Sequence, residues 1–384
     1  MPTRWIRTSS TLAVVGALAA TSCAAPTASS DGPAAAPTSA ATAPSSTELF
    51  DIADRDPLPF PGYDVTRVTI APLPGAAPIE EPAGPPLTGW AAFDAELAGT
   101  ILGGGSDAMS VAVAIDGEIV HRAAFGARVP DTFDAVTPDD RFRVASISKT
   151  ITAIVALQLV EDGVVGLDEP VGRSAAAVAG VPAPTDRAAG VTIRQLLTHT
   201  TGFAQYESLF FRNQVGSCEE AASVGLTRSM GGGGFRYSNM NYCVLGLVIE
   251  SVTGRPYEEV AYERLLTPLG ISGMRLAPTY DPGPGEVEHR SVPGRNYMEV
   301  LAAAGAWVAT PTDLVAIIDS LDHATPGWKP LEPETVAMMK TSATDASSPD
   351  RGYAMGLILY GGGGRDTPAR SRARTPCSSI GPTT

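Results

Sequence analysis

The feature that most constrains this chain is a serine followed, three residues later, by a lysine at the start of a helical pattern. A short apolar stretch leads to Ser146, and Lys149 is the next basic residue. Around the lysine, apolar residues recur at the spacing of an α-helix, at Ile147, Ile151, Ile154, Val155, Leu157 and Leu159. Because side chains three residues apart share one face of a helix, we expect the amine beside the hydroxyl.

This pair of side chains suits nucleophilic catalysis. A hydroxyl becomes a good nucleophile when an adjacent base removes its proton, and a lysine serves as that base when burial lowers its pKa. The free N–H groups of a first helical turn also favour an oxyanion formed at Ser146. The alternative is that Ser146 only caps the helix and Lys149 lies on the surface, since the spacing alone matches many helices.

Composition limits the classes of function. The chain has 384 residues, 44% of them hydrophobic, which is enough for one large core or two subdomains. Its net charge of -14 argues against nucleic acid or an anionic membrane surface as a partner. The four histidines are far apart, and the sequence contains neither an H-E-x-x-H nor a G-x-x-x-x-G-K-[ST] motif. We therefore predict no metal and no cofactor.

The first residues are typical of an export signal. Basic residues precede a short apolar run, and residues 1–23 are predicted to be a signal peptide of a lipoprotein, with lipid attached at Cys23. The alternative is a plain secretory signal cleaved just after that cysteine. Residues 24–47 are almost entirely Ala, Pro, Ser and Thr, and are predicted to be a disordered tether. The protein is thus expected outside the cytoplasm, anchored to a membrane through its lipid or otherwise secreted.

The remaining chain divides into a lead-in, one folded domain and a tail. Residues 48–89 form a proline-rich extended lead-in with a strand-like run at 65–70, and residues 90–360 form the domain. Two strand-like runs joined by Asp116-Gly117 predict a hairpin. Further segments are predicted as a loop at 174–190, helices at 193–197, 239–252, 257–266 and from 311, and a strand at 352–360. Strands at both ends with helices between predict an α+β fold: an antiparallel sheet flanked by helices, with an inserted helical region.

A second polar cluster follows four glycines. Tyr237 and Asn239 lie two apart just before an apolar helix, so they project the same way if the backbone is extended. A phenol can relay a proton to a leaving group, and an amide can both donate to and accept from a substrate. Alone, the cluster is equally typical of a helix N-cap at Ser238 or Asn239.

Taken in order, these motifs resemble those of the serine hydrolases of the class C β-lactamase and D-Ala-D-Ala carboxypeptidase (penicillin-binding protein) superfamily. Besides Ser146-x-x-Lys149 and Tyr237-x-Asn239, the run 196–202 resembles its L-L-x-H-T-[ST]-G signature, and 303–314 its glycine-containing turn before a late helix. The resemblance implies a β-lactamase/transpeptidase-like fold. It also implies that Ser146 is acylated, that Lys149 and Tyr237 share the acid and base roles, and that Asn239 orients the substrate. His199 is expected to stabilise a turn.

Two cysteines within the domain form a candidate disulfide. In an oxidising compartment Cys218 and Cys243 can pair, although sequence alone does not show that their Cα atoms come close enough.

The third motif of the superfamily, K-T-G or H-x-G on a strand, is absent. After the strand predicted at 352–360, residues 361–384 are rich in Gly, Arg, Pro and Ser, so the C-terminal strands are predicted to be missing. The tail is either a basic interaction patch or the product of a reading-frame slip in the glycine run. We favour the slip, because one codon choice for 365–369, shifted by two bases, encodes Gly-His-Thr-Gly. Loss of that strand puts the activity of this chain in doubt.

The sequence therefore predicts an exported serine hydrolase that forms an acyl-enzyme with a small-molecule or peptide substrate: a peptide, amide, ester or β-lactam. The alternative, from another class, is a catalytically inactive envelope protein that keeps the fold as a binding surface.

Overall fold

The computed structural model describes residues 12–19, 89–103, 106–291, 293–344 and 352–359. These residues form a mixed α+β fold of small antiparallel sheets and helices, as the sequence predicts. The lead-in strand expected at 65–70, Cys23 and the tail from 361 lie outside the described residues. None of the helices in the described ranges is both long and apolar enough to cross a bilayer.

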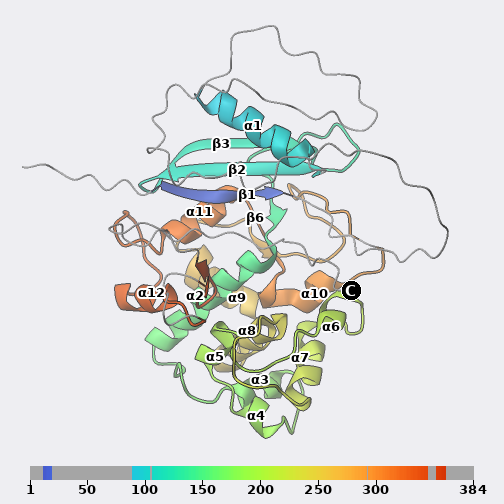
Figure 1. Cartoon of the computed structure of the whole chain (residues 1–384), viewed down its shortest axis with the longest axis vertical. Helices are drawn as coiled ribbons and strands as arrows, with labels where there is room; N and C mark the ends of the chain where they lie inside the picture. The colour runs from blue at the N-terminus through green and yellow to red at the C-terminus, as the bar shows by residue number, and fades with distance from the viewer. Residues whose placement is uncertain (1–11, 20–88, 104–105, 292, 345–351, 360–384) are drawn as a thin grey trace, which may run out of the picture.

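The largest sheet has three strands in the order β1-β2-β3: β1 (Leu12–Ala19), β2 (Ala108–Ile115) and β3 (Glu118–Gly126). The turn between β2 and β3 is the predicted Asp116-Gly117, and both residues have positive φ, as a two-residue hairpin turn requires. β2 is buried on both faces because α1 (Gly89–Gly103) packs on β2 and β3, and α11 (Pro311–Asp319) packs on β1 and β2. Figure 1 shows this layer at the top of the molecule.

Strand β1 comes from the predicted export signal. It runs antiparallel to β2, with Leu12 opposite Ile115 and Ala19 opposite Met109. This segment therefore supplies an edge strand of the three-stranded sheet. Cleavage of the signal peptide and lipid attachment at Cys23 stay predictions, because Cys23 lies outside the described residues.

A second small sheet leads directly into the motif that carries Ser146. Its order is β4-β6-β5: β4 (Phe142–Arg143), β6 (Trp307–Ala309) and β5 (Arg275–Leu276). After β4 the chain forms a 3₁₀ turn, η2 (Ala145–Ile147), and then α2 (Ser148–Glu161). Residues Ser148 to Leu159 of α2 are all buried, so this helix runs through the core and its first turn is held rigidly.

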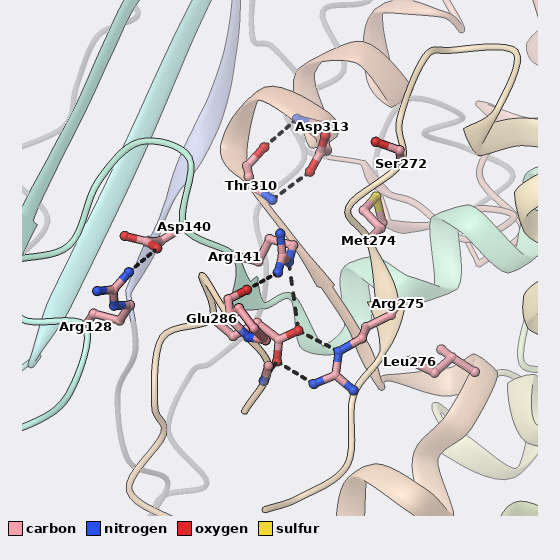
Figure 2. Close-up of polar contacts among 12 residues, drawn as sticks. Arg128, Asp140, Arg141, Ser272, Met274, Arg275, Leu276, Glu286, Thr310 and Asp313 are labelled. Atoms are coloured by element: carbon pink, nitrogen blue, oxygen red, sulfur yellow. Dashed lines mark hydrogen bonds and ion pairs between the residues drawn. The ribbon is translucent and has the colours of Figure 1, made fainter. Parts of the chain in front are cut away.

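A buried carboxylate fastens the loop after β5 to the start of β4. The side chain of Glu286 is 3% exposed and accepts two hydrogen bonds from Arg275, at 2.6 and 2.7 Å. Arg141 lies on its other side, 3.9 Å away, and its backbone N–H donates to the carbonyl of Gly285 (Figure 2). Charged hydrogen bonds of this kind are strong when buried, so they fix the strand that precedes Ser146.

The helical region lies at the opposite end of the molecule from the large sheet (Figure 1). It contains α3 (Gly172–Val178), α4 (Asp186–Ala189), α5 (Ile193–Leu197), α6 (Glu207–Phe211), α7 (Cys218–Thr227) and α8 (Asn239–Thr253). A disulfide joins Cys218 in α7 to Cys243 in α8, with the Cα atoms 5.7 Å apart. The loop predicted at 174–190 is wrong, because α3 and α4 occupy most of it. Its alanines, read as small loop residues, have the highest helix propensity.

The other predicted helices are present: α5 has the predicted bounds, α11 begins at the predicted residue 311, and α8 ends one residue later than predicted. The segment 257–266 divides into α9 (Tyr257–Ala261) and a π-helical turn, η3 (Tyr262–Leu266). The late elements are α10 (Tyr297–Leu301), the 3₁₀ turn η4 (Ala302–Ala304), α11, and α12 (Pro333–Met339).

The strand predicted at 352–360 is wrong as a single element. The chain instead forms a short hairpin of β7 (Gly352–Tyr353) and β8 (Ile358–Leu359). Gly356 turns between them with φ +76°, and its carbonyl accepts a hydrogen bond of 2.8 Å from the Thr150 hydroxyl. A Cβ on Gly356 would stand 2.7 Å from that of Ala153, so close contact with α2 forces a glycine and a turn here.

Candidate active site

Three predicted side chains meet at one oxygen atom. Ser146 lies in η2 and is partly exposed. The Lys149 amine, in the first turn of α2, donates to Ser146 Oγ at 3.1 Å. The phenol of Tyr237, which precedes α8, donates to the same Oγ at 2.8 Å. These are hydrogen-bond distances for a nucleophile, its base and an acid.

The alternative interpretation of the serine and lysine is wrong. The side chain of Ser146 caps no helix, since the residues at the N-cap positions of η2 and α2 are Val144 and Ile147 and neither end has a side-chain cap. Lys149 is only 1% exposed and is not a surface lysine. The capping role before α8 belongs to Ser238, whose hydroxyl accepts from the Met240 N–H, which leaves its neighbours Tyr237 and Asn239 free for other contacts.

Burial sets the charge of Lys149. Desolvation of the amine lowers its pKa to about 7. Besides Ser146 Oγ, the amine donates to Asn239 Oδ1 at 2.9 Å and to the carbonyl of Ala304 at 2.6 Å. Three donated hydrogen bonds fit the ammonium form. When the amine is neutral it has two hydrogens and one lone pair, so the Asn239 and Ala304 oxygens hold both hydrogens and the lone pair accepts the hydroxyl proton of Ser146.

Tyr237 has the opposite tendency. Burial raises the pKa of its phenol, while the hydrogen bond to Ser146 opposes this. The phenol therefore keeps its proton at neutral pH, where the lysine amine readily loses one. The two groups that contact Ser146 Oγ are thus matched as an acid, Tyr237, and a base, Lys149.

His199 holds the Tyr237 segment in place. Its Nδ1 accepts from the Asn241 amide at 2.9 Å and from the Ser238 N–H at 3.3 Å. Because Nδ1 accepts twice, Nε2 carries the hydrogen and donates to the Tyr353 phenol at 3.0 Å. The imidazole also lies against the Tyr237 ring, with centroids 4.4 Å apart. Burial, together with the nearby Lys149, lowers the pKa of His199 well below its usual value, so the ring stays neutral.

Replacing His199 with phenylalanine is expected to lower kcat by roughly 10–100-fold, because an unanchored Tyr237 is displaced and small displacements at a reacting centre are costly. KM should change less, and the pH at which activity is half-maximal should not change, since His199 does not titrate there. Steady-state kinetics across pH on folded protein measure all three. A new inflection in the pH profile would contradict the positioning role.

Sequence reasoning missed several groups that build this site. The carbonyl of Ala304 is a backbone atom, and no residue pattern marks it as a partner of Lys149. The Thr152 hydroxyl lies 2.7 Å from the Ala303 carbonyl and 2.8 Å from the Tyr257 phenol, so it ties α2 to η4. Ala303 and Ala304 were identified only as the start of a family signature, and their contacts depend on the fold.

Backbone strain marks both sides of the reacting groups. Ala145, directly before the nucleophile, has φ +46°, and Ala302, at the start of η4, has φ +42°. Non-glycine residues rarely adopt positive φ, and strained residues concentrate at functional sites. These two residues flank the atoms that Lys149 contacts, the Ser146 hydroxyl and the Ala304 carbonyl.

Comparisons with known proteins agree with this geometry. A family model described as Beta-lactamase matches residues 93–374. Penicillin-binding protein 4* of Bacillus subtilis (strain 168) is 28% identical over 176 residues, 44% of this chain and 37% of that protein. D-alanyl-D-alanine-carboxypeptidase/endopeptidase AmpH of Escherichia coli (strain K12) is 25% identical over 226 residues, 56% of this chain and 57% of that protein. The chain thus matches about half the length of these relatives, or less.

Among solved structures, a D-amino acid amidase from Ochrobactrum anthropi SV3, complexed with L-phenylalanine amide, superposes with a TM-score of 0.55. It is 26% identical, and the match covers 70% of this chain and 79% of the amidase. The described fold and these likenesses point to the same architecture.

Proposed function

Because the chain belongs to the beta-lactamase family, we propose that it is an exported serine hydrolase that forms an acyl-enzyme at Ser146. The observation that carries the proposal is the convergence of the Lys149 amine and the Tyr237 phenol on Ser146 Oγ, at 3.1 and 2.8 Å. The substrate class comprises peptides, amides, esters and β-lactams, whose carbonyl carbons all accept a serine nucleophile. Export and lipid attachment at Cys23 rest on the sequence pattern.

The acid and base roles follow from the pKa shifts. Lys149 accepts the Ser146 proton as Oγ attacks the substrate carbonyl, and the ammonium formed is held by the Asn239 and Ala304 oxygens. The N–H of Ser146 stabilises the oxyanion at the start of η2. Tyr237 donates its proton to the leaving nitrogen or oxygen, and the phenolate formed takes a proton from the water that attacks the acyl-enzyme, while Lys149 returns its proton to the released Ser146 Oγ. The Asn239 amide nitrogen is left to donate to the substrate. Water then cleaves the acyl-enzyme by the reverse proton transfers.

Covalent trapping tests the proposal. A fluorescent penicillin and a fluorophosphonate probe should each label the intact protein, and peptide mass spectrometry should place the adduct on Ser146. The alternative, an inactive envelope protein that keeps the fold as a binding surface, predicts no adduct with either probe in a protein shown to be folded by its thermal unfolding.

The rate of acylation should depend on pH through one group. Because burial lowers the pKa of Lys149 to about 7, kcat/KM should rise tenfold per pH unit below that value and level off above it. Measured against an ester whose leaving group needs no proton, this profile isolates the base. The range from about pH 5 to pH 8 lies within about 2 units of this pKa. A profile that is flat over this range would show that the amine is not the base.

We further propose that the tail from residue 361 results from a frame slip, and that the restored frame supplies a His-Thr-Gly strand. The family match ends at residue 374 and therefore includes part of this tail. The nucleotide sequence across the glycine run decides whether a frame slip occurred. An N–H donor to the oxyanion is worth about 10²–10³ in rate, and restoring it should raise labelling by that factor. If no alternative frame encodes His-Thr-Gly, the proposal fails.

A further inference from the structure

A cavity of about 190 Å³ lies away from the catalytic groups, at the far end of the β2–β3 hairpin. It is open to solvent on one side and is lined by one side of α11, the hairpin turn and the loop after α11. Neither Ser146, Lys149 nor Tyr237 lines it. Its walls are largely apolar, formed by Ile119, Leu269, Val315, Pro326 and Trp328.

One stripe of α11 forms the floor of the cavity. Thr312, Val315 and Asp319 all line it, and they follow one another at the three- and four-residue spacing of a single helix face. At 1.5 Å per residue the stripe is about 10 Å long. It has polar ends: the Thr312 hydroxyl at one end is buried without a hydrogen-bond partner among the described residues, and the Asp319 carboxylate is at the other.

The Asp319 carboxylate makes no ion pair within the part of the chain that the structure describes. It lies against the hairpin turn, where a Cβ on Gly117 would be 3.2 Å from its Oδ2. The nearest lysine in sequence, Lys329, directs its ammonium instead to the backbone carbonyl of Asp319 at 3.4 Å and to the Thr325 hydroxyl at 2.9 Å. The negative charge at this end of the cavity is therefore available to a ligand.

Trp328 supplies the other element of recognition. Trp328 is 40% exposed and lines the cavity wall, so its indole can be reached by a ligand. An indole ring attracts a cation to its face as well as covering an apolar body. A carboxylate and an indole in one small cavity favour an organic ammonium ion over a neutral or anionic molecule.

We propose that this cavity binds a small primary ammonium ion that carries an aryl or short alkyl group. The ammonium pairs with Asp319, and the apolar group packs between Trp328, Ile119 and Val315. The chain's net charge of -14 also raises the concentration of cations at its surface. This site is separate from the proposed hydrolase chemistry, so its occupancy does not depend on Ser146.

The test uses the full chain with isotope-labelled tryptophan, titrated with 2-phenylethylammonium. The sequence contains four tryptophans, and the indole signal of Trp328 is identified by its loss in Trp328→Phe. We expect a saturable shift of that signal, with 2-phenylethanol, a neutral molecule of the same shape, binding about fivefold more weakly because it lacks the ion pair and the cation–π contact.

Asp319→Asn should weaken the ammonium about fivefold and leave the alcohol unchanged, since it removes one partly exposed ion pair. The matched control Glu118→Gln removes an exposed charge of the same hairpin that does not line the cavity, and should change neither. Equal binding of the two probes, no effect of Asp319→Asn, or no saturable shift up to about 50 mM would each overturn the proposal. Binding that persists in Ser146→Ala shows that the site is independent of the catalytic one.

Discussion

Replacing Ser146 with alanine is expected to abolish covalent labelling and to lower kcat/KM by about 10⁴–10⁶-fold, because the oxygen that attacks the substrate is gone. In this variant Lys149 and Tyr237 are left without a hydroxyl to activate. The measurements are probe labelling of intact protein and hydrolysis of an activated ester. Ser251→Ala, at an exposed position of α8, is the matched control and should label like the parent chain.

The alanine variant should stay folded, because Ser146 is partly exposed and, among the described residues, its hydroxyl is hydrogen-bonded to Lys149 and Tyr237 alone. Its thermal unfolding should match that of the parent within a few degrees, so lost labelling reports chemistry. Undiminished hydrolysis in Ser146→Ala, or an adduct on another residue, would rule out the assigned nucleophile.

Replacing Lys149 with methionine is expected to have two opposite effects. Activity should fall about 10³–10⁴-fold, because the base that activates Ser146 is lost. Methionine keeps roughly the volume of the lysine side chain. The pH inflection near 7, which burial of this amine sets, should disappear.

Stability should rise in the same variant. The folded-state pKa of Lys149 is about 7, against an ordinary value of 10.5, and this difference corresponds to roughly 5 kcal/mol at neutral pH and below. Methionine removes that cost but leaves the buried Ala304 carbonyl without its donor, which costs about 1–3 kcal/mol, while the Asn239 side chain is only partly buried and can turn to water. A net gain of roughly 2–4 kcal/mol in the free energy of unfolding is expected at pH 7, typical of a site built for activity rather than stability.

The sign of the pH dependence follows from the lowered pKa. Between pH 7 and 10.5 the unfolded chain binds a proton at this lysine that the folded chain does not, so the free energy of unfolding of the parent protein should rise with pH in that window. Lys149→Met should lack this rise. Lys340→Met is the control: its amine is only partly buried, and burial lowers its pKa to a lesser extent. Denaturant titrations at several pH values measure the slopes, and equal slopes in parent and Lys149→Met would contradict the assignment.

The local elements were predictable wherever local chemistry decides them. Asp116-Gly117 has the two residues that a tight hairpin turn needs, and the apolar spacing after Lys149 marks α2 correctly. The helix predicted at 193–197 has those bounds, and Thr192 caps it with a hydroxyl that accepts from the Gln195 N–H. In each case the interactions that form the element lie within a few residues of one another.

Prediction failed for two different reasons. Residues 172–178 and 186–189 form α3 and α4 because alanine favours helix, a local preference that the interpretation as a loop of small residues overlooked. The segment 352–359 is interrupted by a turn because Gly356 lies against α2, which nothing within the segment indicates.

The identities of the reacting groups were determined by the sequence alone: a serine, a lysine three residues later, and a tyrosine and an asparagine two apart, in the order that a known family shares. Only the tertiary structure decided their chemistry. The Lys149 amine is bound by Asn239, 90 residues away, and by the carbonyl of Ala304, 155 residues away. Its pKa depends on the water that these distant segments exclude, and desolvation is a property of the packed core rather than of any stretch of chain.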